Sequence, residues 1–519
     1  MITDPQAARI PARLPDIPEA PVEQKSSTRL ILFSVAVMLL LAALDQTIVA
    51  TALPAIVADL GGVDHLSWVI TSYLLASTVV APMYGKLGDL YGRKLMMQIA
   101  VVVFLVGSVL SGLATSMLAL IIARGIQGLG GGGLFVLAFT VVGDVVAPRD
   151  RGKIQGIFGS IFGLSSVAGP LLGGFFVDQL SWHWVFFINL PIGGLALTVF
   201  AFAFHSTGKR IRHNLDYPGA LFITASLVGI VLFTSLGGRS FERTSPFMLS
   251  MAIMGVTGAV AFVLAEFRAK EPILPMSLFK SNTFSVMTAV GFLGGIAMFG
   301  GLTFLPLYLQ TVKEISPTMS GLQLLPMSLG ILGGAIGSGQ IMSRTGRYRR
   351  LPVIGMAVTT AGLLLLTRLR PDTGWNEITL YMLLVGIGLG PTMSVGTTAI
   401  QNAVSRDVMG AATAGFTLFR QIGGSIGVSI FGAIFAARLE SSLGNAPMGD
   451  GDISTLGADM IVRLPEPVQV MIREAITNAL HPVFLTAAGA AFIAFIIGWW
   501  LEELPLQTRE DIDRQRREG

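Results

Sequence analysis

Three ionisable residues lie deep inside long apolar stretches of this chain, namely Asp45, Arg124 and Arg420. An ionisable side chain within a membrane-spanning helix is costly, so each is a candidate functional residue. Burial opposes the charging of a carboxyl group, whereas a nearby guanidinium favours it, and a carboxyl group balanced between the two can take up and release a proton. We therefore expect Asp45, influenced by Arg124, to couple proton movement. The alternatives are a helix-packing hydrogen bond for Asp45, an internal salt bridge for Arg124, and structural pairing or snorkelling for Arg420.

The composition indicates that most of the chain lies in a membrane. Hydrophobic residues make up 52% of the 519 residues and charged residues only 13%, with 62 glycines and a mean hydropathy of +0.70. This excludes a soluble enzyme, a disordered chain and a secreted disulfide scaffold. With no cysteine and five histidines, the sequence offers no thiol chemistry and little for a metal site. We predict no enzyme activity, metal or cofactor, and we assign the net charge of +4 to cytoplasmic loops rather than to nucleic-acid binding.

Apolar runs long enough to cross a bilayer predict an all-α polytopic membrane protein with fourteen spans. Lysine and arginine are about three times as frequent in the segments on one side of these spans as on the other, which places both termini in the cytoplasm. We predict a disordered tail over 1–29, a second tail over 502–519, and a long outer loop over 438–481 with a short surface helix at 464–480. The predicted spans are Leu30–Leu53, Leu66–Tyr84, Leu95–Ala114, Met117–Val142, Ile154–Val177, Trp182–Phe204, Pro218–Leu236, Phe247–Phe267, Thr283–Gln310, Pro317–Met342, Leu351–Thr367, Ile378–Ala399, Gly410–Ala437 and Pro482–Leu501.

A short pattern occurs twice, each time where the second span of a six-span block ends. Residues 85–93 and 339–347 share the spacing Gly-x3-[Asp/Ser]-x2-Gly-Arg. The repeat predicts two homologous six-helix bundles, 30–204 and 283–501, with two inserted helices in 205–282. Two repeated helical halves around a central site are typical of transporters that alternate access by rocking.

The first copy of the repeat is a candidate conformational switch, because a charge cluster between the halves can hold one conformation and break in another. The alternative is a plain basic loop. We also expect Asp144, at the end of the fourth span, to pair with Arg149 or Arg151. The candidate switch residues are Gly85, Asp89, Gly92 and Arg93.

Glycine and proline mark the fifth span as a closely packed, pliable helix. Its pattern Gly169-Pro170-Leu-Leu-Gly173-Gly174 places small residues four apart, which lets helix backbones approach closely. Pro170 removes a helical hydrogen bond and favours a bend. Such a helix suits a moving contact between domains.

Several motifs now stand in order along the chain. They are Leu44–Pro54, Gly85–Lys94, Arg124-Gly-Ile-Gln127-Gly128, Gly169–Gly174, Gln401-Asn402, and Arg420-Gln421-Ile-Gly423-Gly424. Together they resemble the major facilitator superfamily, and specifically its fourteen-span drug:proton antiporters of the EmrB/QacA type. The resemblance implies the superfamily fold, with Asp45 and Arg124 in proton coupling and the fifth-span motif indicating export. Gln127, Arg420 and Gln421 are additional candidate site residues.

The sequence also departs from the pattern of that family. Ala50 stands where asparagine is common, Leu90 where a basic residue is common, and Ser343 replaces the acid of the second switch copy. We therefore expect a switch that works from one half only. The tenth span has no acidic residue, which disfavours dicationic substrates and favours mono-cationic or neutral ones.

The sequence thus predicts a proton-coupled antiporter in the cytoplasmic membrane, which exports lipophilic drugs or toxic compounds and confers antibiotic resistance. Its partners would be the lipid bilayer and a small lipophilic substrate, and a periplasmic adaptor protein at the outer loop is left open. The alternative within transport is a dedicated exporter of a metabolite or lipid-like compound. The alternative from another class is a membrane sensor or scaffold that transports nothing.

Overall fold

The structure, a computed structural model, describes residues 24–61, 66–204, 216–237, 241–242, 244–315, 317–443 and 465–506. Most of the predicted tail over 1–29, the tail beyond 506 and the centre of the predicted outer loop lie outside these residues. The described residues are helical and form no β-strand, apart from an isolated bridge between Gly237 and Phe241. The all-α prediction is therefore confirmed for the described part of the chain.

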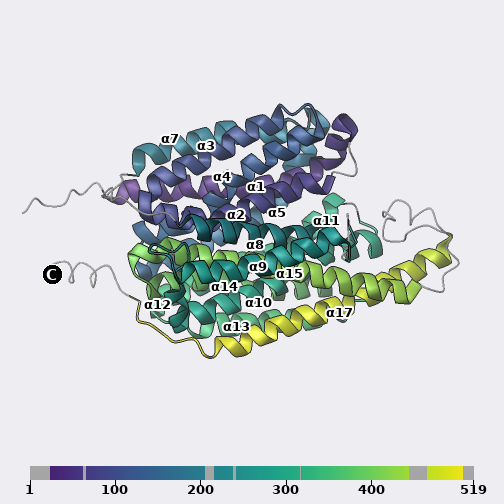
Figure 1. The fold of residues 1–519 in the computed structure, drawn as a ribbon. Coiled ribbons are helices and arrows are strands. Elements are labelled where there is room, and N and C mark those ends of the chain that lie inside the picture. The colour runs from purple at the N-terminus through teal and green to yellow at the C-terminus, as the bar shows by residue number, and fades with distance from the viewer. Residues whose placement is uncertain are drawn as a thin grey trace, which may run out of the picture.

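The helices fall into two bundles with an inserted pair between them (Figure 1). The first half contains α1 (Gln24–Leu60), α2 (Leu66–Tyr91), α3 (Arg93–Gly112), α4 (Met117–Val145), α5 (Pro148–Gln179), α6 (Trp184–Phe187) and α7 (Asn189–Ala203). The inserted pair is α8 (Tyr217–Leu236) and α9 (Pro246–Glu266). The second half contains η2 (Met276–Lys280), α10 (Asn282–Leu307), η3 (Tyr308–Val312), α11 (Pro317–Gln323), α12 (Leu325–Thr345), α13 (Arg350–Leu366), α14 (Trp375–Ala403), η4 (Arg406–Val408), α15 (Met409–Leu443) and α17 (Glu466–Gly498).

Every one of the fourteen predicted spans lies on a helix or on a pair of consecutive helices. Fewer than fourteen of these helices, however, have the length and the apolar composition needed to cross a membrane. Twelve helices in the described part are long and apolar enough to cross a membrane. Helix α13 has 17 residues and falls below that length, and α5 is outside the twelve. The structure therefore supports about twelve membrane-spanning helices and does not confirm fourteen.

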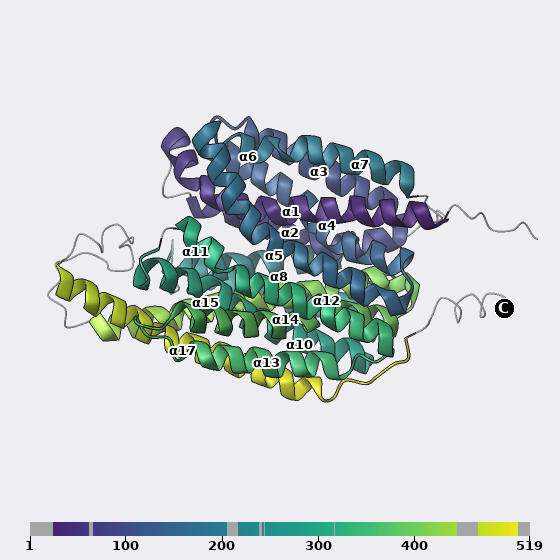
Figure 2. The same cartoon turned by 180° about the vertical axis from the view of Figure 1, so that it is seen from behind.

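Corresponding helices of the two halves make corresponding contacts. In the first half α4 packs against α2 and α3, and in the second half α14 packs against α12 and α13. Glycine makes the close approach within the first half possible: a Cβ atom on Gly132 in α4 would lie 2.1 Å from the carbonyl oxygen of Ser77 in α2. The two bundles form separate layers in Figure 1 and in the reverse view of Figure 2.

The inserted helices bridge the two halves on one side of the molecule. Helix α8 packs against α2 of the first half and α15 of the second. Thr234 of α8 and Ser425 of α15 share a hydrogen bond of 2.5 Å. Leu232 and Leu236 of α8 belong to an apolar cluster that packs against Trp68 of α2.

The start of α1 and the last described residues after α17 lie at the same end of the bundle, which we call the termini end (Figure 1). Helices α2 and α12 both finish there, and the two copies of the sequence repeat form their last turns. The predicted loop is therefore mostly helix, and the chain turns only at the second glycine of each copy. Gly92 has φ of +91° and Gly346 has φ of +69°, backbone conformations that favour glycine.

The predicted outer loop over 438–481 is shorter than expected. Helix α15 continues to Leu443, and α17 begins at Glu466 and runs unbroken through Pro482. The separate surface helix predicted at 464–480 is thus the first part of α17. Its buried residues Ile472, Ala475, Ile476 and Ala479 follow a helical spacing, so tertiary packing stabilises the helix across the proline.

Candidate functional site

Asp45 and Arg124, predicted to act together, are in direct contact at the centre of the first half. Nη1 of Arg124 in α4 lies 2.5 Å from Oδ2 of Asp45 in α1, and both residues are almost fully buried, with exposed fractions of 1% and 0%. The pair places opposite charges together where neither can reach water. A buried pair of this kind depends on further hydrogen bonds to both partners.

The guanidinium of Arg124 is held on every side. Its Nε donates to the carbonyl oxygen of Val69 in α2, and its Nη1 also donates to Oε1 of Gln127 one turn along α4. The Tyr73 ring lies 4.4 Å from Cζ of Arg124, and Phe186 lies on another side at 5.7 Å. These contacts hold the guanidinium in addition to its ion pair with Asp45.

Neutral polar residues from α4 and from two more helices complete what we call the Asp45 cluster. Nε2 of Gln127 donates to Oδ1 of Asp45 at 2.8 Å and to Oγ of Ser108 in α3 at 3.1 Å. Nδ2 of Asn189 in α7 donates to Oγ of Ser108 at 2.8 Å and reaches Oδ1 of Asp45 at 3.4 Å. The cluster is thus Asp45, Ser108, Arg124, Gln127 and Asn189, on four helices.

The sequence analysis missed Ser108, Asn189 and Tyr73. Each is a neutral polar residue in an otherwise apolar helix, and such residues are common in membrane proteins. Their polar side chains were the only feature of the sequence that could have indicated them. Their position near Asp45 and Arg124 depends on how α3, α2 and α7 pack against α1 and α4, which the sequence does not show. Gln127, in contrast, was a candidate from its motif and lies in the cluster.

The glycines of the fifth span join α5 directly to α1 beside the cluster. A Cβ atom on Gly169 would lie 2.1 Å from Oγ1 of Thr47, and one on Gly173 would lie 2.0 Å from Oγ1 of Thr51. Thr47 is two residues after Asp45 and donates to the carbonyl oxygen of Ser165 in α5. Gly174 has no atom within 4 Å of such a Cβ and lies outside this contact, and the side chain of Pro170 is outside the described part of the structure.

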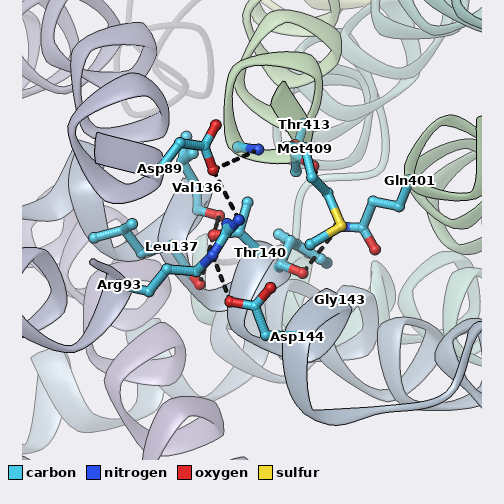
Figure 3. Close-up of polar contacts among 12 residues, drawn as sticks. Asp89, Arg93, Val136, Leu137, Thr140, Gly143, Asp144, Gln401, Met409 and Thr413 are labelled. Carbon is cyan, nitrogen blue, oxygen red and sulfur yellow. Dashed lines mark hydrogen bonds and ion pairs between the residues drawn. The ribbon is translucent and has the colours of Figure 1, made fainter. Parts of the chain in front are cut away.

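The predicted switch forms a contact between the halves at the termini end (Figure 3). Asp89 in the last turn of α2 accepts the backbone N–H groups of Gly410 and Ala411 at the start of α15, at 3.1 and 3.0 Å. The N-terminus of a helix carries partial positive charge, so it attracts a carboxylate. Gly85 packs on the same helix, because a Cβ there would lie 2.8 Å from the carbonyl oxygen of Gly410.

Arg93 ties this contact to the rest of the first half. Its Nη2 lies 2.7 Å from Oδ1 of Asp89, and its Nε lies 2.5 Å from Oδ2 of Asp144 at the end of α4. Arg151 donates to carbonyl groups of α4, and Arg149 donates to a carbonyl group of the other half. We call Asp89, Arg93, Asp144, Gly410 and Ala411 the latch.

The second copy of the repeat also makes contacts between the halves, which the expectation of a switch in one half only did not foresee. Oγ of Ser343 in α12 donates to Oδ1 of Asp150 in the first turn of α5 at 3.0 Å. Arg149 donates to the carbonyl oxygens of Ser343 and Arg344. A Cβ on Gly339 would lie 2.4 Å from the carbonyl oxygen of Gly152, which mirrors the packing of Gly85. An acid on α5 thus replaces the acid missing from α12.

A neutral hydrogen-bond network lies between these two contacts. Nε2 of Gln155 in α5 donates to Oε1 of Gln401 in α14 at 2.9 Å, and Thr398 donates to Oε1 of Gln155. Gln401 in turn donates to the carbonyl oxygen of Phe139 in α4. Hydrogen bonds between the halves therefore gather at the termini end, where they join the two bundles.

Arg420 and Gln421 lie in α15, apart from both the Asp45 cluster and the latch. Arg420 forms no ion pair or hydrogen bond through its side chain with the described residues, so the expected structural pairing is not found there. Oε1 of Gln421 is buried and has no hydrogen-bond partner among the same residues.

The chain is similar in sequence to a known family of proteins and to several of its members. The sequence profile of the Major Facilitator Superfamily matches residues 35–428. The chain is 40% identical to an uncharacterized MFS-type transporter of Mycobacterium tuberculosis over 91% of its own length and 69% of that protein. It is 35% identical to the multidrug transporter protein MdtP of Bacillus subtilis, over 96% of this chain and 97% of that one.

Solved structures show the same fold at low sequence identity. The human organic anion transporter MFSD10 aligns with a TM-score of 0.62 and 15% identity, over 91% of this chain and 99% of that one. The proton:xylose symporter XylE aligns with a TM-score of 0.61 and 13% identity, over 95% of this chain and 99% of that one.

Proposed function

The chain belongs to the major facilitator superfamily of membrane transporters, and we propose that it exports lipophilic compounds in exchange for protons. Membership of a transporter family confirms the prediction that the chain is not an enzyme. The observation that carries the proposal is the Asp45 cluster: a fully buried carboxylate is paired with one arginine and hydrogen-bonded by two amides. Such a carboxyl group can exchange a proton at the cost of a single ion pair.

Protonation of Asp45 would remove the negative charge that faces Arg124. Arg124 would keep its contacts with Val69 and Gln127. The loss of the ion pair would therefore mainly free α1, which carries Asp45, to move. Helix α1 meets α5 at Gly169 and Gly173, and α5 meets α12 of the other half through Gly152. This route gives the charge change at Asp45 a mechanical connection to the contact between the halves.

The orientation and the number of crossings are part of the same proposal. The described ends of the chain lie at one end of the bundle, and the excess of lysine and arginine in the segments at that end favours the cytoplasm. The latch would then join the halves on the cytoplasmic side. We propose that α5 and α13 also cross the membrane, since α5 packs along the membrane-spanning helices α1 and α12 and α13 packs along α14 and α17, which gives fourteen crossings.

The name of the Bacillus subtilis relative, a multidrug transporter, supports a substrate class of lipophilic toxic compounds. The absence of an acid from the tenth predicted span favours mono-cationic or neutral compounds, although Arg420 argues against cations. A dedicated exporter of one metabolite or lipid-like compound is the second candidate within transport. Neither a sensor role nor an adaptor protein has an observation in its favour.

Efflux from intact cells tests the proposal. Cells that express the wild type would be loaded with the neutral dye Nile red or the cation ethidium, and efflux would be recorded before and after a protonophore. We expect efflux of at least one dye that stops with the protonophore and is lost in Asp45→Asn. The matched control is Asp59→Asn, the other aspartate of α1, whose carboxylate accepts the Trp182 indole N–H. Efflux that survives the protonophore would refute proton coupling.

A further inference from the structure

A pocket opens in the second half at the end of the bundle opposite the termini end, which we call the far end (Figure 1). It has a volume of about 430 Å³ and lies between the end of α13, the last turns of α15 and the first half of α17. Sites for small molecules usually have volumes of about 300–1,000 Å³, so the pocket is large enough to hold a ligand.

Helix α13 shows where the pocket lies relative to a bilayer. Its 17 residues begin at Arg350 near the termini end and correspond to about 26 Å. The hydrocarbon core of a bilayer is about 30 Å thick. Thr367, which follows the last residue of α13 and lines the pocket, therefore lies where the hydrocarbon core meets the headgroup region of the far leaflet.

The polar and apolar residues of the pocket are separated along this boundary. Helix α15 runs away from the termini end, so Arg438 and Ser442 belong to the turns of α15 that extend toward the headgroups. Helix α17 runs back, so Leu485 is nearer the hydrocarbon than Asn478 by seven residues, or about 10 Å. The pocket is thus polar on its headgroup side and apolar on its hydrocarbon side, as an amphipathic ligand requires.

The polar side of the pocket offers hydrogen-bond donors and a positive charge. Arg438, Ser442 and Asn478 are exposed, and their side chains form no hydrogen bond or ion pair with the described residues. None of the described residues that line the pocket is acidic, and Glu474, the nearest acid along α17, is one turn further out than Asn478. The planar fork of an arginine matches the oxygens of a phosphate group in both geometry and charge. A phosphate is therefore the group that this side of the pocket fits.

An apolar track continues from the pocket along α17 toward the termini end. Leu485, Gly489, Phe492 and Ile496 follow one another at intervals of four, three and four residues, which places them on one face of the helix. All four are exposed, Leu485 to 57% and Phe492 to 50%. A Cβ atom on Gly489 would meet no atom within 4 Å, so the track is recessed between the two larger side chains. An acyl chain can pack on such a face, whereas a free phosphate would gain nothing from it.

We propose that the pocket binds the phosphate group of a phospholipid in the far leaflet, with one acyl chain lying along the track on α17. Arg438 pairs with the phosphate, and Ser442 and Asn478 donate hydrogen bonds to it. The bound lipid would hold α13, α15 and α17 together at the far end. The inference goes beyond the proposed function, because it requires neither transport nor proton coupling.

Three compounds that share parts of a phospholipid test the proposal. They are dioctanoyl-phosphatidylglycerol, dioctanoylglycerol, which has the same chains without the phosphate, and glycerol phosphate, which has the phosphate without the chains. Their binding to the purified full-length chain in detergent would be measured by native mass spectrometry. We expect dioctanoyl-phosphatidylglycerol to bind about 10-fold or more tightly than either of the others. Arg438→Gln should weaken its binding about 10- to 100-fold and change the binding of dioctanoylglycerol less than about 3-fold.

Two further variants separate a specific site from a general attraction to positive charge. Asn478→Leu keeps every charge and should weaken dioctanoyl-phosphatidylglycerol about 3-fold or more, because it removes a hydrogen-bond donor. Arg370→Gln is the matched control, because Arg370 is an exposed arginine at the far end that does not line the pocket. It should bind dioctanoyl-phosphatidylglycerol as the wild type does.

Three outcomes would overturn the inference. The first is equal binding of dioctanoyl-phosphatidylglycerol and dioctanoylglycerol, and the second is an affinity for the phospholipid that Arg438→Gln leaves unchanged or that Arg370→Gln lowers as much. The third is glycerol phosphate that binds as tightly as the phospholipid and depends on Arg438, which would assign the pocket to a soluble phosphate compound instead of a lipid.

Discussion

Asp89→Asn should weaken the latch, which holds the two halves together at the termini end. We call the conformation with the latch formed closed and the conformation with the latch broken open. The carboxylate is almost completely buried, with 2% of the side chain exposed, and accepts two backbone N–H groups of α15 and one guanidinium N–H of Arg93. Asparagine has the same shape, but its amide nitrogen cannot accept, so one N–H group of α15 loses its partner. Hydrogen bonds to a charged group contribute about 1.5–3 kcal/mol each, and a charge at a helix terminus about 0.3–1 kcal/mol.

We therefore expect Asp89→Asn to cost the closed conformation about 2–4 kcal/mol, which multiplies the ratio of open to closed molecules about 30- to 1,000-fold. The chain has no cysteine, so spin labels can be attached to introduced cysteines without any other change. Leu95 in α3 and Arg350 in α13 are exposed positions in opposite halves near the termini end. Double electron–electron resonance between them should show a new population at longer distance.

Asp407→Asn is the matched control for this measurement. Asp407 is exposed and lies just before α15, so its substitution removes a similar charge at the same helix terminus without removing a buried contact. We expect its distance distribution to match the wild type. An Asp89→Asn distribution that also matches the wild type would refute the claim that the latch stabilises this conformation.

Three other changes test the remaining contacts. Gly339→Ala would place a Cβ 2.4 Å from the Gly152 carbonyl oxygen and should separate the halves in the same spin-label measurement, whereas Gly337→Ala, with no atom within 4 Å, should not. Gln155→Leu leaves Oε1 of Gln401 without its donor and should raise the open population about 5-fold or more, at about 1–3 kcal/mol for an unsatisfied buried group. Asn189→Ala removes a donor to Ser108 and should slow dye efflux with normal expression, and an unchanged efflux rate would show that this residue is dispensable.

The sequence predicted the helices and the Asp45–Arg124 pair because these depend on strong local signals. Apolar runs of membrane length are unmistakable, and Asp45 and Arg124 are among the few charges inside them. The repeat was informative for a similar reason: Gly92 and Gly346 are required by positive φ angles, and Gly85 and Gly339 by contact with the opposite backbone. Each of these requirements restricts the residue type directly.

The partners of charged residues were harder to predict, because tertiary packing selects them. Asp144 forms an ion pair with Arg93, fifty-one positions earlier in the chain, a partner that the sequence did not indicate. Ser343 was read as the loss of a contact, whereas Asp150 on the opposite helix supplies the acid. The count of fourteen spans is not confirmed, because α5 and the 17-residue α13 lie outside the twelve helices that are long and apolar enough to cross a membrane.

The most direct test of the account is whether Asp45 carries the coupled proton. Purified wild type, Asp45→Asn and Asp59→Asn would be reconstituted in liposomes with an internal pH dye, and proton movement would be recorded when Nile red is added. One proton supplies about 2.3 kcal/mol per 100 mV and about 1.4 kcal/mol per pH unit, enough to drive export against a steep gradient. We predict substrate-dependent proton flux in the wild type and Asp59→Asn, and none in Asp45→Asn. Undiminished proton flux in Asp45→Asn would contradict the account.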